Sequence, residues 1–380
     1  MKKKIDIGDK PYVFKKTKIA KHISYNNSYW LYGNNYFFKY SKDRENDTSC
    51  IINEILVSKL CANLKVPCVQ YGYAINLHKI YEHRGVISIS FLSNGEKFIS
   101  LEKMNEQEVL SEYPADLYLK MMVIFARICP LTTIGKCNDL NVITESLIEK
   151  YENHSKLLLP FDRAFIKQNM QTLQEINQKT KTKKCLTIDE CVRSIELFAS
   201  KNDLILDDNI RLNLQKIAIV DALTKQNDRH AGNLGLIFNS KTKEARLAPM
   251  YDNGLSEYFG IDTSLLDYPQ AVNCYLKLTE QDCEKINNPQ TEIAKFYKSA
   301  RDFYQEGGLD EMIENMQEEF DVMNSFRTKY LDEKKGKLVR REKDPHYWEA
   351  VKRNYQKGIT YIDANLKQSQ SYKGFVMENK

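Results

Sequence analysis

The sequence reads IAIVDALTKQNDRHAGNLGLIF over residues 217–238 and RLAPMYDNG over residues 246–254, and these two stretches decide the fold. The apolar start predicts a buried helix that ends near Thr224, where a cluster of polar residues begins. The segment Leu234 to Ala248 predicts a hairpin, because two short apolar runs flank a polar loop. A carboxylate, Asp252, follows the second strand beside a flexible Asn-Gly pair.

The polar residues of this region have the types that phosphoryl transfer requires. That reaction needs an acceptor for the proton of the attacking hydroxyl and oxygen ligands for Mg²⁺. Mg²⁺ prefers carboxylate and amide oxygens, which Asp252 and Asn233 supply. Asp228 is the candidate proton acceptor. Its spacing of five residues from Asn233 equals that of Asp and Asn in the catalytic loop of protein kinases.

The two motifs resemble those of a known kinase family. Asn227–Asn233 (NDRHAGN), followed by Leu247–Gly254 (LAPMYDNG), looks like the catalytic and metal-binding motifs of HipA-like serine/threonine kinases. The pattern is similar in phosphatidylinositol 3/4-kinases, which share that atypical fold. Polar Asn/Asp/Gly clusters are usually plain turns, so the ordered pair of motifs carries the resemblance.

The resemblance implies a role for each residue of the two motifs. Asp228 would be the catalytic base, His230 would orient the loop, and Arg229 would be a structural or phosphate contact. Asn233 and Asp252 would hold Mg²⁺, with ATP as phosphate donor. The implied fold is α+β and two-lobed like a protein kinase, with a small β-rich N-lobe containing one helix and a large, mainly helical C-lobe.

The first ninety residues are predicted to be mostly strands. Aromatic runs at 29–32 and 36–40 flank Gly-Asn-Asn and predict a hairpin. A helix is predicted from Asp47 to about Leu64, followed by strands at 68–75 and 85–92. Ser93-Asn94-Gly95 is the predicted lobe boundary, giving an N-lobe of residues 1–93 and a C-lobe of 94–380. Helices are predicted near 105–129, 138–152, 164–179, 188–201, 208–224, 291–305, 309–330 and 345–365.

The N-lobe supplies the other half of the implied site. Lys39 lies in an otherwise apolar aromatic strand, where a lysine is costly unless it has a partner or an anionic ligand. We expect it to reach the ATP phosphates and to pair with Glu54 of the following helix. Phe91 and Leu92 resemble the hinge of these kinases, whose backbone would hydrogen-bond adenine.

The loop expected to cover the phosphates lies before the strand of Lys39. Only residues 24–28 fit this position, and Ser24, Asn26, Asn27 and Ser28 are the predicted contacts. The loop contains no glycine, unlike that of typical protein kinases. In the family, phosphorylation of a serine at its edge ejects the loop and silences the kinase, a role that Ser24 or Ser28 would take here.

Composition restricts the class of protein. The 380 residues are 42% hydrophobic and 28% charged, an ordinary globular composition. No apolar run approaches the ~18 residues of a membrane span, and the nine cysteines form no CxxC pair. The net charge of +5 is spread along the chain, so we expect no direct nucleic-acid binding. The expected location is the cytoplasm, or a host cytosol if the protein is exported.

Three functions remain open. The first is a kinase acting on Ser/Thr of a protein substrate, and the second is a kinase for a lipid or small molecule. The third is a nucleotide-binding regulator without catalysis, which would not require a base at Asp228. Only some twenty residues precede Ser24, so the chain is expected to be a short form without the N-terminal subdomain of HipA. The docking surface for an antitoxin or regulatory partner would then be missing or supplied by another protein.

Overall fold

The computed structural model describes residues 12–15, 19–23, 28–31, 36–40, 49–77, 82–128, 139–180, 185–226, 228–254, 275–328 and 345–378. The predicted phosphate-loop residues Ser24, Asn26 and Asn27 lie outside these ranges, as does Asn227.

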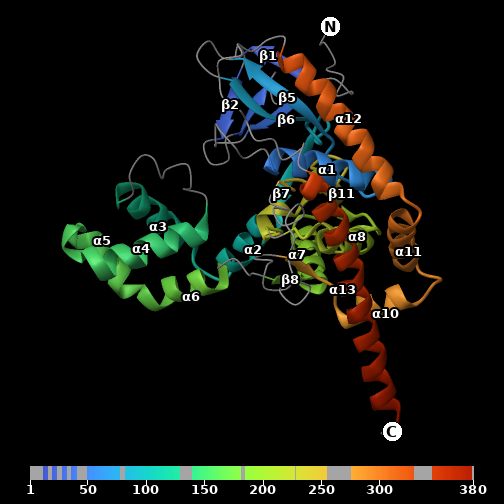
Figure 1. The fold of residues 1–380 in the computed structure, drawn as a ribbon. Coiled ribbons are helices and arrows are strands. Elements are labelled where there is room, and N and C mark those ends of the chain that lie inside the picture. The colour runs from blue at the N-terminus through green and yellow to red at the C-terminus, as the bar shows by residue number, and fades with distance from the viewer. Residues whose placement is uncertain are drawn as a thin grey trace.

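The N-terminal part of the chain forms a six-stranded sheet with one helix packed against it (Figure 1). The strand order is β1-β5-β6-β4-β3-β2. The sheet and its helix comprise β1 (Tyr12–Lys15), β2 (Ile19–Ile23), β3 (Ser28–Leu31), β4 (Tyr36–Tyr40), α1 (Ser49–Asn63), β5 (Tyr71–Leu77) and β6 (Glu82–Ile89). The predicted hairpin is present as the antiparallel pair β3–β4, in which Trp30 lies opposite Phe37.

Strand β6 is shifted from its predicted position at 85–92. It begins at Glu82 and ends at Ile89, so Gly85 lies inside the strand. A Cβ atom at Gly85 would lie 2.0 Å from the carbonyl oxygen of Lys39. The glycine therefore permits a close approach of β6 to β4, the strand that carries Lys39.

A second sheet follows directly and was only partly predicted. Its strand order is β7-β10-β11-β9. The strands are β7 (Glu96–Ser100), β9 (Ile205–Leu206), β10 (Gly235–Asn239) and β11 (Glu244–Leu247). The pair β10–β11 is the predicted antiparallel hairpin, whereas β7 and β9 were not predicted. The chain thus passes from the first sheet to the second between Ile89 and Glu96, and the division into lobes at residue 93 stays a prediction.

Five helices after β7 lead to a separate helical group. They are α2 (Leu101–Leu110), α3 (Ala115–Ile128), α4 (Leu140–His154), α5 (Pro160–Gln168) and α6 (Met170–Thr180), with the short 3₁₀ turn η2 (Ser155–Leu157). Helices α3 to α6 share a hydrophobic core of their own, and Figure 1 shows them to the side of the main body. The single helix predicted at 105–129 is wrong, because Pro114 separates α2 from α3. The helix predicted at 164–179 is likewise two helices, which meet at Asn169.

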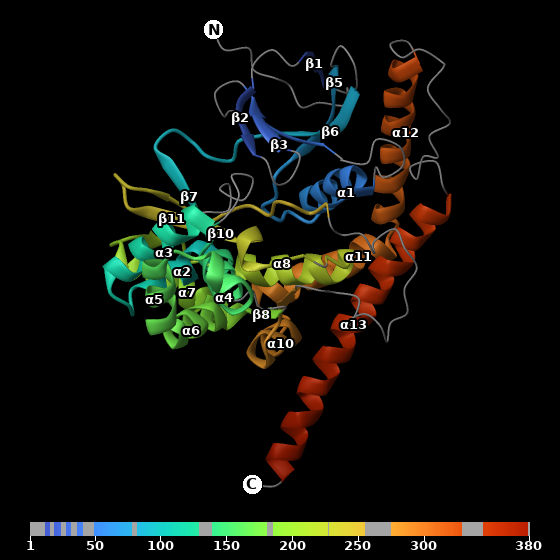
Figure 2. The same ribbon diagram turned by 90° about the vertical axis from the view of Figure 1, so that its left-hand side faces the viewer.

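The remaining helices form the main body. They are α7 (Ile188–Lys201), α8 (Ile210–Thr224), α10 (Glu280–Asn287), α11 (Glu292–Gln305), α12 (Gly308–Thr328) and α13 (Pro345–Glu378); the 3₁₀ turn η3 (Ala231–Asn233) and the parallel strand pair β8 (Cys185–Thr187) with β12 (Tyr275–Lys277) complete it. Helix α8 is buried on most sides and packs against α13 (Figure 2). One core joins α1, α8 and α13. Helix α10 was not predicted from the sequence.

The predicted α+β fold class is confirmed, with a small β-rich part that contains one helix and a larger, mainly helical part. Helix α12, predicted near 309–330, presents an apolar stripe to the core, since Leu309, Met312, Ile313 and Met316 are all buried. None of the helices in the described ranges combines the length and apolar character of a membrane span.

Gly358 on α13 lies where this helix packs closely against α8. An added Cβ would lie 2.6 Å from the carbonyl oxygen of Ala222 on α8. Alanine favours an isolated helix by roughly 1 kcal/mol over glycine, but overpacking against rigid backbone costs about 1–3 kcal/mol. We expect Gly358→Ala to lower the free energy of unfolding measured in urea. The exposed Thr360→Ala on the same helix serves as control, and a more stable Gly358→Ala variant would contradict the packing.

Candidate functional site

A lysine and two carboxylates from distant parts of the chain meet between the first sheet and the main body. The Lys39 Nζ atom of β4 lies 2.9 Å from Oε1 of Glu54 on α1. The same Nζ atom also donates a short hydrogen bond to Oδ1 of Asp252. Lys39 and Glu54 were expected to pair and do so. The contact of Lys39 with Asp252 also brings the N-terminal sheet to the second motif, residues 247–254.

The three charges set one another's pKa values. Burial by itself would lower the pKa of Lys39, but Glu54 and Asp252 outweigh it, so the pKa of Lys39 is raised and the ammonium is kept. Burial opposes ionisation of Asp252 too, yet the neighbouring Lys39 holds the pKa of Asp252 below its ordinary value. Burial raises the pKa of Glu54, whose side chain is only 1% exposed. The charge of Lys39 therefore favours the ionised form of Asp252.

Two adjacent residues of helix α1 form hydrogen bonds with the second motif. The second carboxylate oxygen of Glu54 accepts a hydrogen bond of 2.8 Å from the backbone N–H of Asn253. The side-chain amide of Asn53 donates to the carbonyl oxygen of Gly254 at 3.3 Å. Asp252, the residue just before Asn253, has a φ of 56°, a left-handed conformation that is uncommon for residues other than glycine. The two contacts hold the backbone directly after Asp252.

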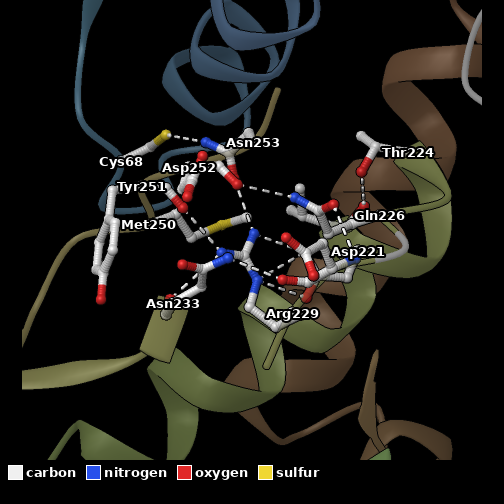
Figure 3. A network of polar contacts seen from close by, with 12 residues as sticks. Cys68, Asp221, Thr224, Gln226, Arg229, Asn233, Met250, Tyr251, Asp252 and Asn253 are labelled. Carbon is white, nitrogen blue, oxygen red and sulfur yellow. Dashed lines mark hydrogen bonds and ion pairs between the residues drawn. The ribbon is translucent and has the colours of Figure 1, made fainter. Parts of the chain in front are cut away.

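The guanidinium group of Arg229 joins the two motifs from below (Figure 3). Its side chain is fully buried and forms two parallel hydrogen bonds with the carboxylate of Asp221, each of 3.0 Å. It also donates to the carbonyl oxygen of Tyr251 at 2.9 Å and to Oδ1 of Asn253 at 2.8 Å. Of the two roles implied for Arg229, the structure places it as a structural contact, because its donors are engaged by protein groups.

Asp221 is a residue that sequence reasoning missed. It lies on α8, eight residues before Arg229, in the apolar run Ile217 to Leu223. Burial raises the pKa of Asp221, and Arg229 opposes this shift by favouring the charged form. A carboxylate inside an apolar helix requires a partner, and this signal was present in the sequence.

The first motif forms a tight loop around η3. The side-chain amide nitrogen of Asn233 donates to the backbone carbonyl of Asp228 at 2.8 Å. This hydrogen bond closes the loop between the two residues. Nδ1 of His230 accepts a 2.9 Å hydrogen bond from the N–H of Gly232 within the same loop. The orienting role of His230 stays a prediction. The carboxylate of Asp228 is about one third exposed and lies 3.9 Å from Nε2 of His230. Burial, together with the charge of Asp252, raises the pKa of Asp228.

Gln226 ties this loop to the second motif. Its amide donates to the carbonyl oxygen of Asp252 at 3.3 Å, and its Oε1 atom accepts from the N–H of Asp228 at 3.2 Å. Gln226 was not among the predicted site residues. Gln226 thereby links the backbone of Asp228 to that of Asp252, and Arg229 adds a contact to the neighbouring Tyr251.

The hinge-like residues contact the second motif through an aromatic group. The rings of Phe91 and Tyr251 are stacked, with centroids 6.0 Å apart, and both contact the ring of Phe98 on β7. The Leu92 N–H donates to Oγ of Ser90 at 3.3 Å. Phe91 therefore lies beside the second motif, whereas the N–H of Leu92 already donates to a local partner. The adenine contact predicted for these two residues stays a prediction.

The predicted phosphate loop is placed only through its last residue. Ser28 begins β3 and lies opposite Lys39 in the register of β3 and β4. The loop therefore leads into the strand beside the candidate phosphate-binding lysine. The roles of Ser24, Asn26, Asn27 and Ser28 stay predictions.

The donor atoms of the predicted metal ligands fit Mg²⁺. Asp252 offers an ionised carboxylate, and the amide oxygen of Asn233 accepts no hydrogen bond from a described residue, because the contact to Asp228 uses the nitrogen. Within the described ranges no group of three or more His, Cys, Asp or Glu side chains could hold a metal ion. One carboxylate plus one amide is the sparse set that Mg²⁺ uses when substrate phosphates and water supply the other ligands.

The buried ion pair gives a stability prediction. Removing one partner leaves a buried, uncompensated charge, which costs about 3–5 kcal/mol. We expect Asp221→Ala to lower the free energy of unfolding in guanidinium chloride by that amount. Asp116→Ala removes the exposed partner of Lys120 and should cause no measurable loss. Equal losses in the two variants would contradict the role of the Arg229 contacts.

The chain was compared with known families, curated proteins and solved structures. No protein-family model and no curated protein matches this sequence. Among solved structures, the chain is similar to the proinflammatory kinase CtkA of Helicobacter pylori, with 11% identity, a TM-score of 0.46 and a match over 96% of this chain and 99% of that one. It is also similar to a chain of the Shewanella oneidensis MR-1 complex of the toxin–antitoxin system HipA and HipB with operator DNA. That match has 13% identity and a TM-score of 0.34, over 87% of this chain and 60% of that one.

Proposed function

We propose that this chain is an ATP- and Mg²⁺-dependent kinase of the HipA-like type that transfers the γ-phosphate to Ser or Thr of a protein substrate. The observation that carries the proposal is the position of Lys39, which bridges Glu54 and Asp252. Kinases require a strand lysine paired with a helix glutamate, together with a metal-binding aspartate. Here the three groups come from separate segments of the chain, and both carboxylates contact the ammonium group of Lys39.

Each polar group has a task in this proposal. Lys39, kept positive by its two carboxylate neighbours, would bind the phosphates of ATP. Asp252 and Asn233 would hold Mg²⁺, which would neutralise charge on the phosphates when bound. Asp228 would accept the proton of the attacking hydroxyl. Its raised pKa supports this role, since a base works best with a pKa nearer to the working pH.

The contacts of the first motif favour catalysis over simple nucleotide binding. The backbone N–H of Asp228 donates to the side chain of Gln226, and the backbone carbonyl of Asp228 accepts from the side chain of Asn233. Both contacts fix the backbone of Asp228 and leave its carboxylate available. A binding-only protein has no need of a positioned base. A lipid or small-molecule acceptor stays the alternative for the substrate, and the acceptor is decided by experiment.

The first test follows the phosphate. We expect wild-type protein incubated with Mg·ATP, or with Mg·ATP and cell extract, to transfer phosphate to itself or to a protein, seen as a gain of one phosphate in intact mass. Asp228→Asn removes the base and should abolish transfer while ATP still binds. Asp139→Asn, at the N-cap of α4 in the separate helical group, is the control and should stay active.

The outcomes separate the three functions. ATP binding by the wild type without any transfer would overturn the kinase proposal and favour a silent regulator. Transfer that occurs only in a lipid extract would assign the alternative acceptor. Equal transfer by wild type and Asp228→Asn would remove Asp228 as the base.

The second test concerns Lys39. Charged hydrogen bonds contribute about 1.5–3 kcal/mol, so we expect Lys39→Ala to weaken ATP binding roughly tenfold or more, as measured by isothermal titration calorimetry. Lys352→Ala is a matched control, because Lys352 on α13 also contacts two carboxylates, those of Asp310 and Glu349. Unchanged ATP affinity in Lys39→Ala would show that the N-terminal half of the site is wrongly assigned.

A further inference from the structure

The N-terminal end of the long helix α13 reaches helix α1 next to the candidate site. The hydroxyl of Tyr347 donates a 2.8 Å hydrogen bond to Oδ1 of Asn53. Both side chains are buried, Asn53 completely. Asn53 precedes Glu54, the partner of Lys39. Figure 1 shows this end of α13 directly beside α1, far from the free end of the same helix.

The hydroxyl of Tyr347 helps to hold the amide of Asn53 in one orientation. An amide side chain has an acceptor end and a donor end of nearly the same shape. The carbonyl oxygen of Gly254 can only accept, so it requires the amide nitrogen, which lies 3.3 Å away. The Tyr347 hydroxyl donates to the amide oxygen at the other end. Together the two partners fix the orientation in which Asn53 binds the second motif.

Asn53 and Glu54 together hold two consecutive residues of the second motif. Glu54 accepts from the N–H of Asn253, and Asn53 donates to the carbonyl of Gly254. The residue immediately before this pair is Asp252, whose left-handed backbone needs support from its neighbours. A rotation or shift of α1 would break both contacts and would also move Glu54 away from Lys39.

We propose that Tyr347 is a positioning residue for the phosphoryl-transfer site, acting through Asn53 to hold α1 and the Asp252 motif in register. The C-terminal helix thereby supports the N-terminal half of the site, and the inference rests on the proposed kinase function for its effect on rate. Helix α12 supports the same arrangement, because Glu319 pairs with Lys59 one to two turns further along α1. No group on α13 touches substrate in this proposal.

A matched pair of tyrosines tests it. Tyr347→Phe removes the hydroxyl and keeps the ring that packs against Trp348, with centroids 5.1 Å apart. Tyr355→Phe, on the same helix, removes an equally buried hydroxyl whose 3.0 Å hydrogen bond goes to Ala300 on α11. Both variants should lower the melting temperature by similar amounts, since each loses one buried hydrogen bond. Only Tyr347→Phe should affect the site.

Two readouts are measured on the full chain. The rate of phosphate transfer at saturating Mg·ATP should fall roughly three- to tenfold in Tyr347→Phe and stay unchanged in Tyr355→Phe, the effect expected for one net hydrogen bond. Amide hydrogen exchange of Asn253, whose N–H is bound by Glu54, should accelerate by a similar factor in Tyr347→Phe alone.

The path through Asn53 is tested by combining variants. If Tyr347 acts through Asn53, the double variant Asn53→Ala/Tyr347→Phe should be no slower than Asn53→Ala. Additive losses would place the effect of Tyr347 elsewhere. Identical behaviour of Tyr347→Phe and Tyr355→Phe in both readouts would overturn the proposal. A wild type without phosphate transfer would refute the proposed function, whereas the exchange of Asn253 would still decide the positioning role.

Discussion

The guanidinium group of Arg229, buried away from water, holds the two polar motifs of this protein in one place. It binds Asp221 on α8 with two parallel hydrogen bonds, and it reaches the backbone of Tyr251 and the side chain of Asn253 on the other side. A buried ion pair adds little stability compared with apolar packing, but it is very costly to break. Its main effect here is geometric, because a planar fork with five donors fixes the direction of every partner.

The remaining contacts of the site depend on that geometry. Because Arg229 fixes Asn253, the backbone N–H of Asn253 is available to Glu54, and α1 can dock against the second motif. The docking of α1 brings Glu54 to Lys39, and the ammonium group then bridges to Asp252. A continuous chain of contacts therefore links the core of the helical part, through the candidate site, to the first sheet. Tyr347 and Glu319 reach α1 from the C-terminal helices and hold it from the opposite end of the chain.

The sequence predicted local features best. The hairpins β3–β4 and β10–β11, the helix α1 and the apolar stripe of α12 all follow from short-range periodicity and turn residues, and each is present. Errors arose where a single residue ends an element, as at Pro114, or where pairing partners are distant in sequence. Strand β7 has little apolar alternation, and it is a strand because Phe98 and Ile99 pair with β10, more than 130 residues later.

By itself, the sequence determined the residue types of the candidate site and their local spacing, such as Asp228 to Asn233 on one tight loop, because a five-residue turn is closed by its own hydrogen bonds. It also indicated that Lys39 needs an anionic partner, since a charge in an apolar strand is costly. Only the tertiary structure decided that Lys39 meets Asp252, that Asp221 is the partner of Arg229, and that Tyr347 reaches Asn53. These pairs join segments packed together by the shared core, and no local pattern specifies which buried polar groups the core will bring within hydrogen-bonding distance.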